Sequence, residues 1–135
     1  MATIFTKIIN GEIPCYKIAE DENYFAFLDI RPVVKGHTLV VPKKETDYIF
    51  DLDDTDLSSM ILFAKKVSKA LQQVVPCKRI ALMVLGLEVP HAHIHLLPIQ
   101  NEAEFNIKNK HTFPESEMTA IAQAVQKNFA NINLY

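Results

Sequence analysis

Apolar residues recur at two spacings along the first third of the chain, and turn-forming residues separate the segments. Apolar residues at helical spacing precede Gly11 and predict a short helix within the first ten residues. Two β-rich stretches follow at 16–19 and 24–28, with a polar run between them that is typical of a hairpin turn. A third strand is expected at 37–41, where Pro42 ends it. This part of the chain therefore predicts a helix followed by three strands.

A longer helix is expected after the acidic segment 51–56, which offers several N-caps. It should run to about Val75, because Pro76 cannot continue a helix. The apolar residues of this segment fall three or four apart, as a helix packed on a sheet requires. They are Leu57, Ile61, Ala64, Val67, Leu71 and Val74.

The remaining segments predict two further strands, at 79–85 and 91–99, and a last helix that starts at 114–117 and runs through Phe129. Between them, the polar segment 100–110 is expected to be a loop. Of the 135 residues, 49% are hydrophobic, which is enough to cover one sheet with one or two helices. We therefore expect a single domain over residues 1–135.

Charge, cysteine content and hydropathy limit the partners and the compartment that we expect for this protein. The formal charge is −2 and no basic tract occurs, so nucleic acid is not expected and any bound phosphate should belong to a small ligand. Cys15 and Cys77 form neither a CxxC pair nor a dense disulfide pattern, which favours reduced thiols in the cytoplasm. The first residues lack a signal-peptide pattern, and the apolar run 80–87 is too short to span a bilayer. Membrane insertion is therefore not expected.

Histidines occupy every second position of His91-Ala92-His93-Ile94-His95. In a strand, the two-residue period would set the three imidazoles on one face, roughly 6.5 to 7 Å apart from one to the next. Three interpretations stay open: ordinary core or surface imidazoles, a metal site, or a nucleophilic imidazole whose neighbours bind phosphate oxygens. The last is favoured, because imidazole is unprotonated near neutral pH and ligands on one straight strand converge poorly on a metal.

The histidine motif, followed by two apolar residues and Pro98, resembles the defining motif of the histidine triad (HIT) superfamily. The segments 3–9, 12–14, 27–32 and 36–44 look like the Hint branch of that family, in matching order and spacing. The resemblance covers residues 3–98, which would form the HIT core, while residues 99–135 would be a C-terminal extension. It implies an α+β HIT fold with a five-stranded antiparallel sheet, a long central helix, a short N-terminal helix and an extra C-terminal helix.

The resemblance also implies a homodimer whose two sheets join into one, with a mononucleotide site on each protomer. In that family the middle histidine, here His93, forms a covalent nucleotidyl-histidine intermediate. His95 and His37 would contact the phosphate, and His91 would support the nucleophile. Asp29 would hold the ribose hydroxyls with its two acceptor oxygens. The base pocket would be lined by Ile4, Phe5, Phe27 and Leu39.

Each of these positions also has an ordinary structural explanation, which stays open. Asp29 stands before a proline-containing turn that it could simply cap. His37 follows Gly36 and could be an ordinary residue at the start of a strand. The four apolar residues of the expected base pocket are of types that more often belong to a core than to a ligand site.

The sequence departs from the resemblance at a zinc site that many relatives build from a CxxC pair and two histidines. Thr3 and Thr6 stand at the two cysteine positions, and Glu45 stands where one of the histidines would be. Three of the four ligands are thus absent, so we predict no structural zinc. We expect no other cofactor and a metal-independent reaction.

A second departure lies just before the histidine motif. Leu87 replaces a glutamine of the relatives, and Glu88 stands where Hint proteins often place a serine that helps the leaving group. A carboxylate beside a phosphate repels it but can accept a hydrogen bond from an amine, so Glu88 should favour phosphoramidates. The usual basic residue after the motif is replaced by the pair Ile99 and Gln100, which makes dinucleoside polyphosphates less favoured.

These observations predict a purine nucleoside phosphoramidase or nucleotidyl hydrolase that acts on a purine mononucleotide or nucleoside phosphoramidate. One alternative is a dinucleoside polyphosphate hydrolase. Another is a nucleotide-binding regulatory protein without turnover, which the altered segment before the histidine motif makes credible.

Overall fold

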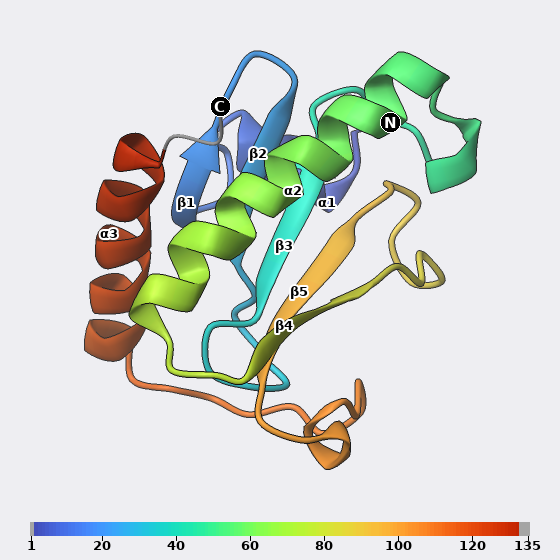
Figure 1. Ribbon diagram of the computed structural model, residues 1–135. Coiled ribbons are helices and arrows are strands. Elements are labelled where there is room, and N and C mark those ends of the chain that lie inside the picture. Colours follow the sequence, from blue (N-terminus) through green and yellow to red (C-terminus); the bar gives the residue numbers. More distant parts are fainter. Residues whose placement is uncertain (1, 133–135) are drawn as a thin grey trace.

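The computed structural model describes residues 2–132 and shows a five-stranded antiparallel sheet with helices on both faces (Figure 1). The helices are α1 (Ile4–Ile9), α2 (Asp54–Val74) and α3 (Glu115–Asn131), with short 3-10 turns at Ile49–Asp51 and Glu102–Glu104. The strands are β1 (Tyr16–Glu20), β2 (Tyr24–Leu28), β3 (Thr38–Pro42), β4 (Arg79–Met83) and β5 (Ile94–Ile99). They lie in the order β1-β2-β3-β5-β4. The predicted fold class is confirmed, with its long central helix and its shorter N-terminal and C-terminal helices.

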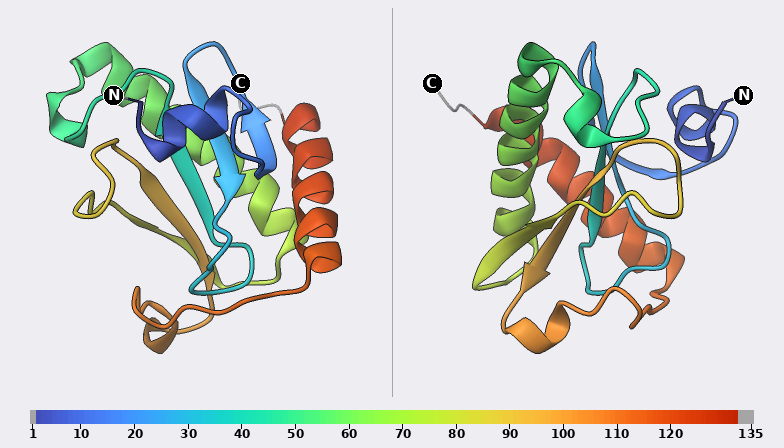
Figure 2. Two further views of the ribbon diagram at one scale, coloured as in Figure 1. Left: turned by 180° about the vertical axis from the view of Figure 1, so that it is seen from behind. Right: turned by 90° about the vertical axis from the view of Figure 1, so that its right-hand side faces the viewer.

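The two faces of the sheet are covered by different helices. α2 crosses one face and α3 packs beside it against β1, whereas α1 lies on the opposite face (Figures 1 and 2). Asp53 is the N-cap of α2, and its side chain accepts the N–H of Asp56 at 2.7 Å. None of the helices within residues 2–132 combines the length and the apolar character that a membrane span requires.

Successive side chains of each strand point to opposite faces of the sheet, so the buried core is divided between the two faces. Ala26, Leu28 and Val40 belong to the larger cluster under α2 and α3, whereas Phe27 and Leu39 belong to a second cluster under α1. Leu39 stands opposite His95 in the β3–β5 ladder, so both side chains leave the same face. The histidine-bearing face is therefore the α1 face, and α3 does not cover it.

The buried stripe of α2 differs from the predicted one. Ala64, Val67 and Leu71 are buried as expected, but Ile61 is 43% exposed and its neighbours Met60 and Phe63 are buried instead. The reason is the second helix, because the ring of Phe63 packs between Tyr24 of β2 and Phe129 of α3. Packing against both a sheet and a helix turns the stripe toward residues 60 and 63.

Two strand boundaries were also predicted wrongly. β4 ends at Met83 rather than at residue 85, and β5 begins at Ile94 rather than at residue 91. Between these strands the backbone forms hydrogen bonds outside the β4–β5 ladder: the N–H of Ala92 donates to the carbonyl of Thr46 at 2.7 Å. His91 therefore lies outside the strand, and the three histidines do not alternate along it.

The connection between β2 and β3 depends on Gly36. This residue has a φ of +85°, and a Cβ there would lie 2.9 Å from Cγ2 of Val75 and 3.1 Å from Cγ of Pro98. Only glycine suits both the left-handed backbone and the close approach. The connection closes with the N–H of Asp29 donating to the carbonyl of His37 at 2.9 Å, which brings two predicted site residues together.

Candidate active site

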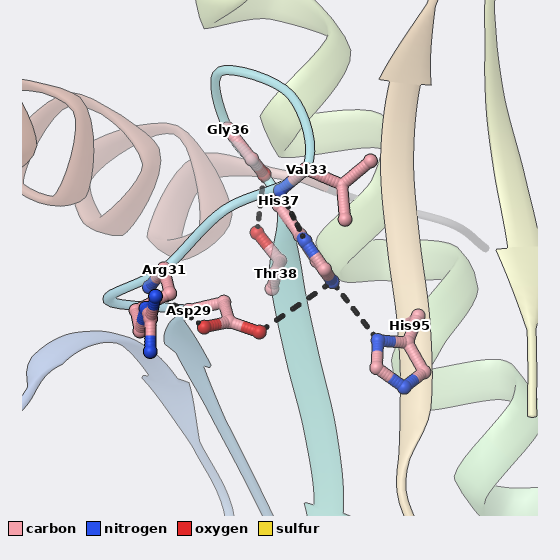
Figure 3. Close-up of polar contacts among 7 residues, drawn as sticks. All are labelled: Asp29, Arg31, Val33, Gly36, His37, Thr38 and His95. Atoms are coloured by element: carbon pink, nitrogen blue, oxygen red, sulfur yellow. Dashed lines mark hydrogen bonds and ion pairs between the residues drawn. The ribbon is translucent and has the colours of Figure 1, made fainter. Parts of the chain in front are cut away.

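A chain of hydrogen bonds fixes the orientation of His37 and His95 (Figure 3). The backbone N–H of Val33 donates to Nδ1 of His37 at 3.1 Å, so the hydrogen of that imidazole sits on Nε2. Nε2 of His37 lies 2.9 Å from Nδ1 of His95 and donates to it. The ring hydrogen of His95 must then be on Nε2, which makes His95 a hydrogen-bond donor at that atom.

His93 is held in the opposite tautomer. Its Nδ1 lies 2.8 Å from the backbone carbonyl of His91, and a carbonyl can only accept, so Nδ1 carries the hydrogen and Nε2 carries a lone pair. Within residues 2–132, no side-chain polar atom is both buried and without a partner, so Nε2 of His93 and Nε2 of His95 are open to the cavity that both residues line. The two ring centroids are 4.9 Å apart. The site thus presents a lone pair and an N–H side by side.

Burial keeps these imidazoles neutral. It lowers the pKa of His37 to about 4 and that of His95 to about 4, and the charge of Lys110 acts in the same direction on both. Burial also lowers the pKa of His93 from its ordinary value. At neutral pH the lone pair on His93 is therefore available.

Asp29 has one oxygen engaged and one facing the site. Oδ1 accepts the backbone N–H of Arg31 at 2.9 Å, so the turn-capping explanation holds for that oxygen. Oδ2 lies 3.8 Å from Nε2 of His37, and the residue lines the cavity (Figure 3). Burial raises the pKa of this carboxyl.

An apolar wall adjoins these polar groups in one cavity of about 500 Å³. All four residues predicted for the base pocket line it, and Ile4 is the most exposed of them at 49%. The ring of Phe5 stands edge-on to Phe27, at 5.7 Å between centroids, and to His93, at 5.0 Å. The volume and the lining are within the range of small-molecule sites.

His91 lies apart from this cavity. It is fully buried, and its Nε2 donates to the backbone carbonyl of Pro42 at 2.7 Å while its Nδ1 lies 2.7 Å from Oγ1 of Thr3. The prediction that the three histidines alternate along one strand is wrong, because the strand starts after His93. His91 still lies on the α1 side of the sheet, with its ring centroid 5.7 Å from that of Phe5. The contact of His91 with the site runs through its backbone carbonyl, which holds His93.

Charged side chains of both signs border the cavity. Glu88 is exposed on the loop before β5 and borders the cavity. Arg31, Lys108 and Lys110 border it too, and sequence reasoning missed them. No ion pair ties up any of these three cations within the described part of the chain. The segment 105–111, here called the C-terminal arm, reaches the site because the N–H of His111 donates to the carbonyl of Pro32 at 2.8 Å.

Comparison with known proteins identifies the family of this chain. Residues 10–102 match the HIT domain. The chain belongs to the HIT family. A HIT-like protein of Methanocaldococcus jannaschii is 44% identical over 103 residues, which are 70% of this chain and 77% of that protein. An adenosine 5′-monophosphoramidase of Schizosaccharomyces pombe is 39% identical over 107 residues, or 76% of this chain and 77% of the relative. A zinc-bound HIT protein of Mycobacterium smegmatis superposes with a TM-score of 0.82 at 25% identity, covering 97% of this chain and 95% of the other.

The zinc ligands expected in many HIT proteins are replaced here by groups that do not suit the metal. Thr3, Thr6, Glu45 and His91 do lie together, but the two threonines contribute neutral hydroxyls that are already hydrogen-bonded. Only one carboxylate and one imidazole remain as ordinary zinc ligands. Within residues 2–132, no group of three or more histidine, cysteine, aspartate or glutamate side chains could hold a metal ion.

Proposed function

We propose that this HIT protein hydrolyses purine nucleoside phosphoramidates through a covalent nucleotidyl intermediate on His93. The observation that carries the proposal is the pair of opposite tautomers, a lone pair on Nε2 of His93 beside an N–H on Nε2 of His95, at one end of an apolar cavity. Two relatives, from Schizosaccharomyces pombe and Saccharomyces cerevisiae, are named adenosine 5′-monophosphoramidases at 39% and 36% identity. Their names support the same substrate class.

The first step is displacement at phosphorus. Nε2 of His93 forms a bond to the α-phosphorus as the bond to the leaving nitrogen breaks, and that nitrogen takes one proton from solvent and departs as an amine. The imidazole becomes cationic in this step. Its Nδ1–H bond to the carbonyl of His91 strengthens accordingly, so the carbonyl stabilises the transition state more than the ground state.

Water completes the reaction. Its oxygen bonds to phosphorus, the bond to His93 breaks, and one proton returns to solvent, so the products are a nucleoside monophosphate and an amine. In both steps the N–H of His95 donates to a phosphoryl oxygen, where negative charge develops. Asp29 would accept hydrogen bonds from the ribose hydroxyls, with the base against the apolar wall that includes Phe5 and Phe27.

The first experiment measures release of AMP from an adenosine 5′-phosphoramidate in the presence of a chelator. Wild type should turn over, and His93→Ala should lose turnover by at least about a thousandfold while AMP binding stays within a few-fold, because a nucleophile contributes mainly to the transition state. His111→Ala is the matched control, since His111 is exposed and does not line the cavity.

Two outcomes would overturn the proposal. Equal losses of binding and turnover in His93→Ala would remove His93 from the role of nucleophile. Binding of AMP with no release from any substrate would instead favour the nucleotide-binding regulatory protein.

The second candidate, a dinucleoside polyphosphate hydrolase, gains support from the C-terminal arm. The sequence argument against it was the missing basic residue after the histidine motif. Lys108 and Lys110 bring positive charge to the same cavity from farther along the chain. A dinucleoside polyphosphate therefore belongs in the first assay as the second substrate.

We also propose that the protein is a cytoplasmic homodimer. Cys15 and Cys77 are both free thiols, as is usual in a reducing compartment. The edge strand β4 has β5 as its one neighbour within the described sheet, which leaves an edge to which a second copy can add.

A further inference from the structure

A hydrogen-bonded cluster of Thr3, Thr6, Glu45 and His91 lies behind the nucleophile, and we infer that it orients His93 in place of the metal that zinc-binding relatives carry. We call it the threonine–glutamate network. The inference rests on the proposed role of His93 as nucleophile. It makes Thr3, Thr6 and Glu45 positioning residues, none of which touches the cavity.

The direction of every hydrogen bond in the network follows from its acceptors. The carbonyl of Pro42 can only accept, so His91 carries its hydrogen on Nε2 and offers a lone pair on Nδ1. The hydroxyl of Thr3, at 2.7 Å, therefore donates to Nδ1. Oγ1 of Thr3 still accepts the N–H of Thr6 at 3.1 Å, which is the N-cap of α1.

Glu45 completes the network from a different part of the chain. Its Oε1 accepts the backbone N–H of Thr3 at 2.8 Å and the hydroxyl of Thr6. These hydrogen bonds, with that of the Thr6 hydroxyl first, hold the pKa of Glu45 below its ordinary value, so the group remains an acceptor down to acidic pH.

The network reaches His93 by two routes. His91, whose ring it locks, presents the carbonyl that holds Nδ1–H of His93 at 2.8 Å. Helix α1, whose first turn it anchors, carries Phe5 against the ring of His93 at 5.0 Å between centroids. Loss of the network should therefore loosen both supports of the nucleophile while leaving the cavity lining unchanged in composition.

The chemistry of the four groups explains why hydrogen bonds can take the place of a metal. A zinc ion joins its ligands by bonding to each of them, and a structural site needs four ligands, which are mostly thiolates and imidazoles. Here the carboxylate of Glu45 joins Thr3 and Thr6, and the hydroxyl of Thr3 donates to the imidazole of His91. Both arrangements tie the start of α1 to the residues after β3 and before β5.

The test compares variants of Thr3 that keep or remove its hydroxyl. Thr3→Val should lower kcat for the phosphoramidate by about 5- to 10-fold with KM within about 2-fold, as the loss of one hydrogen bond predicts. Thr3→Ser keeps both bonds and should stay within about 2-fold of wild type. Thr55→Val, on an exposed position of α2, is the matched control.

Because Thr3 also caps α1, Glu45→Ala separates the network from capping. This substitution leaves the cap in place and should also lower kcat, but by a smaller factor, since Glu45 is exposed.

Nitrogen-15 spectra of the imidazoles give a readout that needs no substrate. In wild type they should show His91 with its hydrogen on Nε2, and Thr3→Val should shift the Nδ1 signal of His91. Wild-type kcat in Thr3→Val together with an unchanged His91 signal would overturn the inference.

A second arm restores the metal. The triple variant Thr3→Cys, Thr6→Cys, Glu45→His should bind one zinc ion per chain, lose it when His91→Ala is added, and recover kcat only with zinc bound. Wild type should hold no zinc through His91. If the triple variant binds zinc without regaining kcat, the metal does not replace the network in orienting His93, and the inference fails. If no phosphoramidate is a substrate, the spectra and the zinc stoichiometry still decide it.

Discussion

At the scale of single residues, hydrogen bonds to backbone groups set the tautomers of the site histidines. The spacing of the histidines predicted His93 and His95, and resemblance added His37 and Asp29, all of which line one cavity. The tautomers depend on backbone groups, such as the N–H of Val33, that have no signature in the sequence. Those of His37 and His95 follow from the path of the β2–β3 connection, and that of His93 follows from the carbonyl of His91 before β5; no local sequence pattern predicts either path.

Protonation of His37 and His95 should couple folding to pH. An unfolded histidine takes up its proton near pH 6.5, whereas these two do so at about 4 in the folded protein. The unfolded chain therefore binds more protons between these values, and the free energy of unfolding should decrease as pH falls from about 6.5 to about 4. Urea denaturation at several pH values measures the slope.

The matching variant is His95→Gln, which removes one of the two titrating groups. Its free energy of unfolding should depend less on pH between about 6.5 and about 4 than that of wild type. Carboxylates far from residue 95 contribute alike to both proteins and cancel in the comparison. Parallel slopes for the two proteins would contradict the lowered pKa of His95.

At the scale of elements, periodic segments were predictable and irregular ones were not. The caps and spacing that predicted α2 are local properties, and the helix runs from Asp54 to Val74 as expected. The loop before β5 and the C-terminal arm are held by long-range bonds, such as those from Ala92 to Thr46 and from His111 to Pro32. No local pattern encodes such a bond, so Lys108 and Lys110 could not be assigned to the site from the sequence.

The charges of the arm should select the leaving group. Lys108→Gln combined with Lys110→Gln should lower kcat/KM for a dinucleoside polyphosphate by about 10-fold, because this substrate carries more negative charge. The loss for a phosphoramidate with a neutral amine should be less than about 3-fold. Both effects are modest, because each exposed lysine is screened by solvent. Lys65→Gln with Lys69→Gln, on the exposed side of α2, is the control. Glu88→Gln should shift the preference in the opposite direction, and equal effects on both substrates would argue against either role.

At the scale of the whole molecule, the sheet has an edge, at β4, that no other strand of residues 2–132 pairs with. β4 lies at one end of the strand order, and Leu82 on it is 51% exposed, while Leu85 just beyond it is 47% exposed. An uncovered edge with apolar side chains favours pairing with another strand. In a two-fold symmetric dimer the same edge of each copy meets the other, which would join the sheets into one.

If the β4 edge forms the dimer, a charge on it should separate the protomers. Sedimentation of the wild type at micromolar concentration should give a dimer, and Leu82→Lys should give a monomer, because symmetry brings the two lysines near each other across the junction. Phe50→Lys provides the control, since Phe50 is 69% exposed but lies in the 3-10 turn before α2. A wild-type monomer, or dissociation by Phe50→Lys with an intact Leu82→Lys dimer, would place the contact elsewhere. Leu82 does not line the cavity, so a monomeric Leu82→Lys variant should still bind AMP.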